Sequence, residues 1–405
     1  MKIVVYEHVC GGGYAGQPLP MGVLAEGFAM LRCVVADFRA VGHQVTVLLD
    51  SRLYRLSPPL EANYTSQVLY ADEPKKLLNN LVKNNDAVYV IAPETGQTLQ
   101  SYVQVVEIIG KLSLNSPSDA IAKVADKADL YEVLQKNGYA TPKTLVLNVA
   151  DSPQQIEQAI ASQLAYPVIF KPVDGAGCSG INLVACTQDI GVARTKIRAE
   201  TKNPRFIAQE RVEGEPVSVS LLSNGTKAEA MTLNRQQITL VAGAESSYVG
   251  GCVPFKHPKK EEAMALAERV VGSFGLRGYV GVDLVLGQEK IFILDINARL
   301  TTSYVGLRQV VGFNIAQALI KAVTTRELPQ KPRPLGVACF SKTQISQPNL
   351  AAYRRAAKIP GIIAPPFPLP DCTDGVAMTM GYGETMLEAQ ARLEEAKKML
   401  SRIIV

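Results

Sequence analysis

The chain of 405 residues has no tryptophan, only three histidines and no C-x-x-C pair among its seven cysteines. The histidines, His8, His43 and His257, form no H-x-x-x-H pair, so the sequence predicts no histidine-rich metal site. The cysteines are scattered and odd in number, which argues against a disulfide framework and against a thiolate zinc site. Free thiols, most of them buried, are the interpretation that remains.

An excess of charge of one sign and long apolar runs are missing too. Lys and Arg number 42 against 37 Asp and Glu, a net charge of +5, and no block of like charges marks a nucleic-acid-binding tract. No apolar stretch approaches the roughly 18 residues of a membrane span. The start, MKIVVYEHVCGGGY, lacks the apolar core and cleavage site of a signal peptide. We therefore expect a globular cytoplasmic protein that binds neither nucleic acid nor membrane.

The first 113 residues predict a small parallel α/β domain, because apolar strands alternate with a helical pattern. The expected elements are a strand at Lys2–Tyr6, a helix at about Leu24–Val41, and strands at Gln44–Leu49 and Ala87–Ile91. Beyond residue 113 the pattern is that of α+β structure. Helices are expected at 118–137, 153–164 and 188–200, and strands at 145–148, 168–172, 181–186 and 205–212.

A glycine loop lies inside KPVDGAGCSGINLV, residues 171–184. Gly175, Gly177 and Gly180 match the G-x-G-x-x-G pattern of dinucleotide-binding turns, in which a helix follows the glycines. Here a strand follows them instead, which disfavours an NAD-dependent oxidoreductase. We predict a flap between two antiparallel strands, with backbone N–H groups available to phosphate. A plain hairpin turn is the alternative, but Lys171 on the entering strand favours an anion site.

The sharpest signal is the stretch YVGVDLVLGQEKIFILDINAR, residues 279–299, which predicts a hairpin turning near Gln288. That register brings Asp283 close to Asp295, and period-2 alternation places Asn297 and Arg299 on the same face as Asp295. An Asp in an apolar strand is costly unless it is paired or binds metal. Two carboxylates and an amide oxygen suit Mg²⁺, with Mn²⁺ also compatible. Polar residues on a half-exposed sheet are the alternative.

Taken together, these motifs resemble those of the ATP-grasp superfamily, over about residues 115–330. The matching segments are 126–127, 138–144, 168–171 with the glycine loop, 209–215, 282–283 and 294–299. The resemblance implies an ATP-grasp fold: a pre-ATP-grasp α/β domain (1–113), two α+β subdomains that grip ATP (114–205 and 206–330) and a C-terminal extension packed on the core (331–405). It also implies an ATP-dependent carboxylate–amine ligase that forms an acyl-phosphate.

The resemblance assigns roles to individual residues. Arg299 and Lys171 would be catalytic, and Asp283, Asp295 and Asn297 would hold the metal. The ATP-binding residues would be Lys127, Lys171, Gly175, Gly177, Ser179, Gly180, Gln209, Glu210, Val212 and Glu215. The family commonly has Glu where this chain has Asp295. Its ribose-binding carboxylate often stands at the position of Pro216, so Glu213 and Glu215 both remain candidates.

The two substrates would be a small acid and an amine. Glu7 and His8 follow the first strand, where ligands collect in α/β sheets, although an ordinary turn is equally compatible. Arg235, Thr301 and Ser303 are further substrate-binding candidates, and the segments 234–236 and 248–254 are expected as loops near the cleft. The stretches LNRQQI, SYVGGCVPF and DINARLTTSY resemble ATP-grasp ligases that join tyramine, or tyrosine, to the glutamate γ-carboxylate in methanofuran-type biosynthesis.

Two further possibilities concern function and assembly. The chain could be an ATP-binding sensor that ligates nothing, but the complete set of lysines, metal carboxylates and arginine argues against it. The tail predicts a strand at Ala377–Tyr382 and a helix at Thr385–Ile403. Its apolar stripe, Ala389, Leu393, Ala396 and Leu400, indicates core packing or a homodimer edge.

Overall fold

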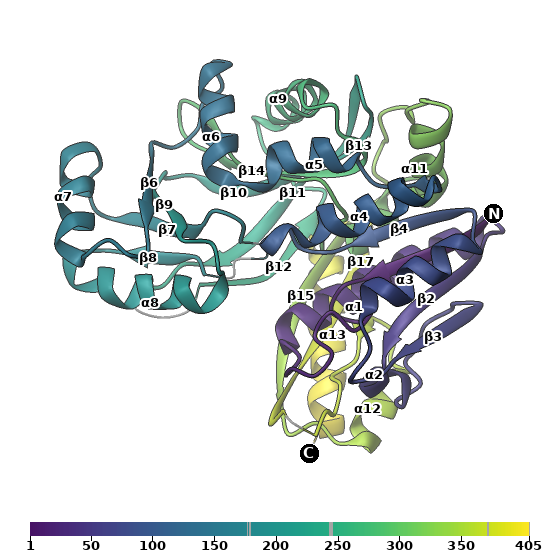
Figure 1. Ribbon diagram of the computed structural model, residues 1–405. Coiled ribbons are helices and arrows are strands. Elements are labelled where there is room, and N and C mark those ends of the chain that lie inside the picture. Colours follow the sequence, from purple (N-terminus) through teal and green to yellow (C-terminus); the bar gives the residue numbers. More distant parts are fainter. Residues whose placement is uncertain (176, 178–179, 243–245, 371, 405) are drawn as a thin grey trace.

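The computed structural model describes residues 1–175, 177, 180–242, 246–370 and 372–404. Three sheets organise the chain: a parallel sheet at the N-terminus, a small antiparallel sheet and a large antiparallel sheet. In Figure 1 the small sheet, with α7 and α8, projects to one side of the other two. Among the described residues no helix combines the length and apolarity needed to cross a membrane.

The parallel sheet has both faces buried, as its nearly continuous apolar strands lead one to expect. Along β1, Ile3 and Val5 join the core that contains α1, whereas Val4 and Tyr6 join the core that contains α3 and α4. The strand order is β3 (Tyr64–Val68), β2 (Gln44–Asp50), β1 (Lys2–Glu7), β4 (Ala87–Ile91) and β5 (Leu112–Ser113). The helices are α1 (Met21–Ala40), α2 (Ser51–Tyr54), α3 (Pro74–Lys83) and α4 (Thr98–Ile109), with a 3-10 turn at Thr95–Gln97.

The small sheet is antiparallel, in the order β6 (Thr144–Asn148), β9 (Arg205–Glu210), β7 (Val168–Pro172) and β8 (Asn182–Val184). Strands β7 and β8 flank the glycine loop and pair antiparallel. This pairing confirms the predicted flap topology and excludes the strand–turn–helix arrangement of a dinucleotide-binding turn. Helices α7 (Pro153–Gln163) and α8 (Ile190–Glu200) pack on this sheet through Ile156, Ile160, Ile190 and Ile197.

The helix expected over 118–137 is in fact two helices, α5 (Ser118–Ala125) and α6 (Lys127–Lys136). The break falls at Asp126, whose backbone is extended and whose carboxylate accepts from the N–H groups of Ala128 and Asp129. A short acidic side chain at this position caps the orphan donors of a helix start. The cap places Lys127 in the first turn of α6, beside the strand end of β7, where its N–H donates to the carbonyl of Val173.

The large sheet runs β14 (Ile291–Asn297), β13 (Arg277–Leu286), β10 (Glu215–Asn224), β11 (Ala228–Thr239), β12 (Ser247–Val253), β15 (Val337–Ser346), β17 (Asp374–Gly383) and β16 (Ile362–Ala364). The tail thus continues this sheet, since β15 pairs with β12. The remaining helices are α9 (Lys260–Ser273), α10 (Tyr304–Val310), α11 (Ile315–Thr324), α12 (Leu350–Ala356) and α13 (Met386–Ile404).

Helix α13 buries its predicted stripe: Ala389 and Leu400 have no exposed surface, and Leu393 packs with Val337 and Cys339.

We expect Leu400→Ala to lower the free energy of unfolding by about 2–5 kcal/mol, because it leaves a cavity in a closed site. Leu387, on the same helix but 78% exposed, is the matched control, and Leu387→Ala should change stability by under about 0.5 kcal/mol. Chemical denaturation of both variants measures this, and equal losses would contradict the packing role of the stripe.

Candidate functional site

One cavity of about 290 Å³ lies where the three sheets meet. Its lining includes the ends of β1 and β4, helix α1, the start of α6, the base of the flap, strands β10 to β12, and the β13–β14 hairpin with the loop that follows it. Of the predicted site residues, it is lined by Glu7, Lys127, Lys171, Gly175, Gly177, Asp283, Asp295, Asn297, Arg299, Thr301 and Ser303. Residues more than 280 positions apart in the sequence therefore share one chamber.

The β13–β14 hairpin has the predicted register, with Asp283 directly opposite Asp295. The pKa of Asp283 is raised to about 6, first by burial and then by the charge of Asp295. Hydrogen bonds to the Asp283 carboxylate from Asn297 Nδ2 and Gln236 Nε2, both at 3.0 Å, act in the opposite direction. A buried carboxylate whose ionisation is disfavoured by a close second carboxylate forms a site where a cation would be stabilising.

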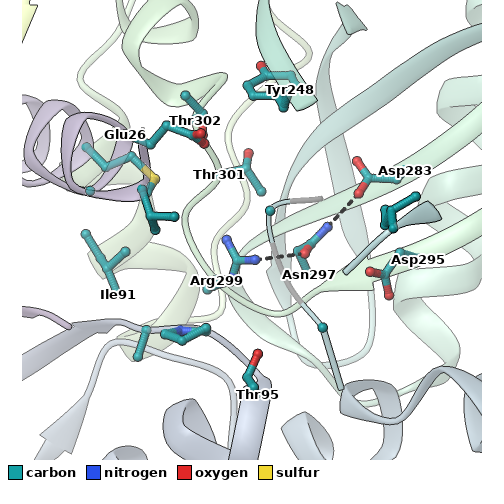
Figure 2. Close-up of a pocket in the computed structure, with 18 of the residues that line it drawn as sticks. Glu26, Ile91, Thr95, Tyr248, Asp283, Asp295, Asn297, Arg299, Thr301 and Thr302 are labelled. Atoms are coloured by element: carbon teal, nitrogen blue, oxygen red, sulfur yellow. Dashed lines mark hydrogen bonds between the residues drawn. The ribbon is translucent and has the colours of Figure 1, made fainter. Parts of the chain in front are cut away.

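A hydrogen-bonded chain leads from this pair to the middle of the cavity. Arg299 Nη2 donates to Asn297 Oδ1 at 3.1 Å, and Asn297 in turn donates to Asp283, as the dashed lines in Figure 2 show. On its other side, Arg299 Nε donates to both carboxylate oxygens of Glu94, at 3.0 and 3.1 Å. The guanidinium is thereby held in one orientation at the edge of the open space, with its positive charge fixed there.

The two predicted phosphate lysines enter from the side of the small sheet. Lys171 lies on β7, and Lys127 begins helix α6 beside it. Lys127 Nζ lies 2.8 Å from Asp295 Oδ2 and donates to the carbonyl of Gly175, also at 2.8 Å. Lys127 therefore links Asp295, one of the two carboxylates predicted to hold a metal, to the base of the flap. Lys171 is only 8% exposed and donates to Gln209 Oε1 at 2.7 Å. The burial of Lys171 fits its apolar surroundings in β7 and places a cation beneath the glycine loop.

Other predicted residues lie away from this cavity. Gln209 does not line the cavity, but it accepts a hydrogen bond from Lys171, which does. Glu210 is the last residue of β9, Glu215 is the first residue of β10, and Val212 lies between the two strands. Gly180 ends the described part of the flap, and Ser179 lies outside the described residues. Glu213 does not line the cavity, nor does Glu215, whose carboxylate is 3.4 Å from Arg235 Nη2.

The segments 234–236 and 248–254, expected as loops, lie largely within strands β11 and β12. This expectation was wrong because glycines and polar residues are typical of loops, whereas here they lie in two central strands of the large sheet. Alternation along β11 places Arg235 on the face opposite Gln236. Arg235 lies over the ring of Phe255, 5.6 Å from its centre, whereas Gln236 lines the cavity and donates to Asp283.

Glu7, the last residue of β1, and His8, which follows it, have separate environments. Glu7 is 4% exposed, lines the cavity, and accepts from the N–H of Cys10 at 2.7 Å. Its pKa is raised by burial, which the hydrogen bonds from Cys10 and the charge of Arg299 only partly offset. His8 turns instead into an aromatic cluster with Tyr6, Tyr14 and Tyr102. His8 therefore lies outside the cavity lining, whereas Glu7 remains available to a substrate.

The pKa of His8 is lowered to about 4 by burial, against about 6.5 for a solvated imidazole. The fold thus favours neutral His8, and its contribution to stability is complete above pH 6.5 and is lost as the pH falls towards 4. Between pH 7.5 and 5 this loss should amount to about 1–2 kcal/mol. We expect His8→Gln to remove that part of the acid destabilisation, measured as unfolding free energy against pH. His257→Gln, outside the cluster, is the control; identical pH profiles for wild type and His8→Gln would contradict the burial effect.

Sequence reasoning missed three contributors. Glu94, which orients Arg299, comes just after β4, at the same sheet edge as Glu7 at the end of β1, so the strand-end rule could have found it. Glu26 and Lys342 carried no such signal, because the two partners lie far apart in the sequence. Gln236 belongs to the segment 234–236, which was a candidate near the cleft, but its hydrogen bond to Asp283 was not predicted.

The donor set fits a hard divalent cation. Asp283, Asp295 and Asn297 supply carboxylate and amide oxygens, the ligands that Mg²⁺ prefers, next to open space where phosphate oxygens could complete the shell. Within the described residues no group of three or more His, Cys, Asp or Glu gathers as a metal cluster. Among the described residues, Cys10, Cys33, Cys186, Cys252 and Cys339 are free thiols. A site with two carboxylates and an amide would therefore depend on the substrate for its remaining ligands.

Comparison with known families decides how this geometry is interpreted. Residues 43–121 match the pre ATP-grasp 3 domain, and residues 124–303 match the ATP-grasp domain. The chain belongs to the ATP-grasp superfamily. The family and the fold predicted from the sequence are thereby confirmed. ATP binding and the use of a divalent metal are general properties of ATP-grasp proteins.

Individual relatives place this ATP-grasp chain among ligases. It is 29% identical to a tyramine–L-glutamate ligase from Methanocaldococcus fervens over 335 residues, 81% of this chain and 96% of the relative. Two solved structures share the fold. Biotin carboxylase from Campylobacter jejuni has a TM-score of 0.74 at 13% identity, over 98% of this chain and 90% of the other. An L-amino acid ligase from Bacillus licheniformis has a TM-score of 0.66 at 14% identity, over 98% of this chain and 97% of the other. The predicted enzyme class, an ATP-dependent ligase, is confirmed.

Proposed function

We propose that the protein is an ATP- and Mg²⁺-dependent ligase that joins the glutamate γ-carboxylate to tyramine, or to tyrosine, through an acyl-phosphate. The observation that carries the proposal is the meeting, in one cavity, of two lysines beside the flap, the Asp283–Asp295 pair and Arg299. A cytoplasmic role in methanofuran-type cofactor biosynthesis follows from this proposal.

The residues of the cavity match the needs of the chemistry. A carboxylate is a poor electrophile until phosphoryl transfer turns it into a mixed anhydride with a good leaving group. Lys127 and Lys171 would hold phosphate oxygens, and Arg299 would neutralise charge on the transferred group. Asp283, Asp295 and Asn297 would hold Mg²⁺, which would neutralise further phosphate charge. The flap would exclude water, which otherwise hydrolyses an acyl-phosphate.

Two features support glutamate and an aromatic amine as the substrates. The first is the similarity to tyramine–L-glutamate ligases from two Methanocaldococcus species. The second is the cavity wall formed by the N-terminal domain, where Val9, Met30 and Ile91 offer an apolar surface beside the carboxylate of Glu7. An aryl ring with an ammonium group fits such a combination.

The test is ADP release with Mg-ATP, L-glutamate and tyramine, each omitted in turn, with mass spectrometry of the product. We expect ADP and a glutamyl–tyramine adduct only when all three are present. ADP with glutamate alone would indicate an acyl-phosphate lost to water, so the amine would be wrong. ATP binding without ADP formation in any combination would overturn the substrate assignment.

A further inference from the structure

A second charged cluster lies at the cavity, on the side of the N-terminal domain: Glu26, Thr302 and Tyr248 line the cavity, and Lys342 adjoins it through Glu26. Glu26 of α1 accepts from Lys342 of β15, with Nζ 2.6 Å from Oε1. Its other oxygen, Oε2, accepts from Thr302 Oγ1 at 2.8 Å. The ring of Tyr248, which also lines the cavity, lies 5.8 Å from Lys342 Nζ. The phosphate chemistry proposed above requires none of these four residues.

The position of this cluster relates it to the reacting end of the substrate. Figure 2 shows Glu26, Thr302 and Tyr248 on one side of the cavity and Asp283 and Asp295 on the other, with Arg299 and Thr301 between them. Thr302 is only three residues after Arg299 in the same loop. An acid whose reacting carboxylate lies at Arg299 therefore extends towards Glu26 when it is a few bonds long.

A purely structural role explains the pair poorly. Helix α1 is already anchored by a long apolar face, which includes Leu24, Phe28 and Val34, all fully buried. A partly buried ion pair adds little stability, because the cost of removing both charges from water offsets their attraction. The side chains of Glu26 and Lys342 remain 11% and 19% exposed, so neither charge is sealed from solvent. A charge pair of this kind is matched by a ligand that carries the opposite pair.

We propose that Glu26 and Lys342, with Thr302, bind the α-ammonium and α-carboxylate of an amino-acid substrate, in an inference that rests on the proposed ligase function. Glu26 receives the ammonium and Lys342 the carboxylate, while the side-chain carboxylate reaches Arg299. Thr302 fixes the orientation of Glu26. The enzyme then distinguishes glutamate from acids that lack either group at the α-carbon.

Three acids with the same spacing between the reacting carboxylate and the α-carbon position separate the two contacts. L-glutamate has both α-groups, glutarate lacks the ammonium and 4-aminobutyrate lacks the α-carboxylate. In ADP release with tyramine, Glu26→Gln should raise the KM for glutamate about 10- to 100-fold and leave that for glutarate nearly unchanged, because one charged hydrogen bond is lost. Lys342→Met should raise the KM for glutamate by a similar factor and leave the KM for 4-aminobutyrate nearly unchanged. A parallel loss on all three acids would overturn the proposal.

A charge-reversed variant tests the structural alternative directly. Glu26→Lys combined with Lys342→Glu restores an ion pair between α1 and β15 but reverses its polarity. If the pair binds the substrate, the double variant should regain the melting temperature lost in the single variants, but its KM for glutamate should stay high. Recovery of both would show that the pair acts only as a tether and would overturn the proposal.

Failure of the ligase assignment gives a different result. If wild type forms no ADP with glutamate and tyramine, calorimetric titration of the common L-α-amino acids, without amine, decides the matter. Binding that is lost in both Glu26→Gln and Lys342→Met would support the recognition site even though the proposed substrates fail. Absence of binding for every α-amino acid would overturn it.

Discussion

Arg299→Met is expected to lower kcat for ADP formation about 100- to 1000-fold, which is the usual loss when a preorganised donor to developing charge is removed. Nucleotide binding should change little, since Lys127 and Lys171 approach the cavity from other elements, helix α6 and strand β7. The expected pattern is therefore a fall in kcat with a nearly constant KM for ATP, measured by coupled ADP release.

The same substitution leaves Glu94 as a buried carboxylate without its cation, which by itself is destabilising. Glu94→Gln in the Arg299→Met background removes that unpaired charge, so the double variant should regain thermal stability but not activity. Arg299→Lys should regain part of the rate, because the charge returns without the two-pronged geometry. Recovery of full activity in the double variant would show that Arg299 only balances Glu94 and plays no part in the reaction.

Local patterns in the sequence were sufficient to predict the hairpin and the flap. The alternation around Gly287 fixed which residues of β13 and β14 face each other, so the pairing of Asp283 with Asp295 was predicted correctly. The strand after the glycines likewise distinguished a flap from a dinucleotide-binding turn. These features depend on neighbours within about 20 residues, where side-chain period and turn chemistry are decisive.

Contacts made by the tertiary fold could not be predicted in this way. Arg299 and Glu94 are 205 positions apart, and Lys342 and Glu26 are 316 apart. Each pair forms because the N-terminal sheet docks on the large sheet, and no local period encodes that docking. Strand β3 was missed for a related reason: it lies at a sheet edge, only Val68 of its residues YTSQV is buried, and the segment lacks an apolar alternation.

The Asp283–Asp295 pair leads to a prediction whose sign depends on the metal. Without a cation, two carboxylates beside the phosphate site repel a polyphosphate; with Mg²⁺ they attract it through the ion. Asp283→Asn combined with Asp295→Asn should therefore weaken binding of Mg-ATP while strengthening binding of metal-free ATP. The rate of ADP formation should fall at least about 100-fold, because charge on the transferred group is no longer neutralised.

Calorimetric titration of ATP with excess Mg²⁺ and with EDTA measures both signs on one protein preparation. Glu289→Gln removes a carboxylate from the exposed turn of the same hairpin and should leave both affinities unchanged. The opposite signs are the decisive feature, because general damage to the site would weaken binding under both conditions. Weaker binding with and without metal would therefore argue that these aspartates maintain the hairpin and do not hold a cation.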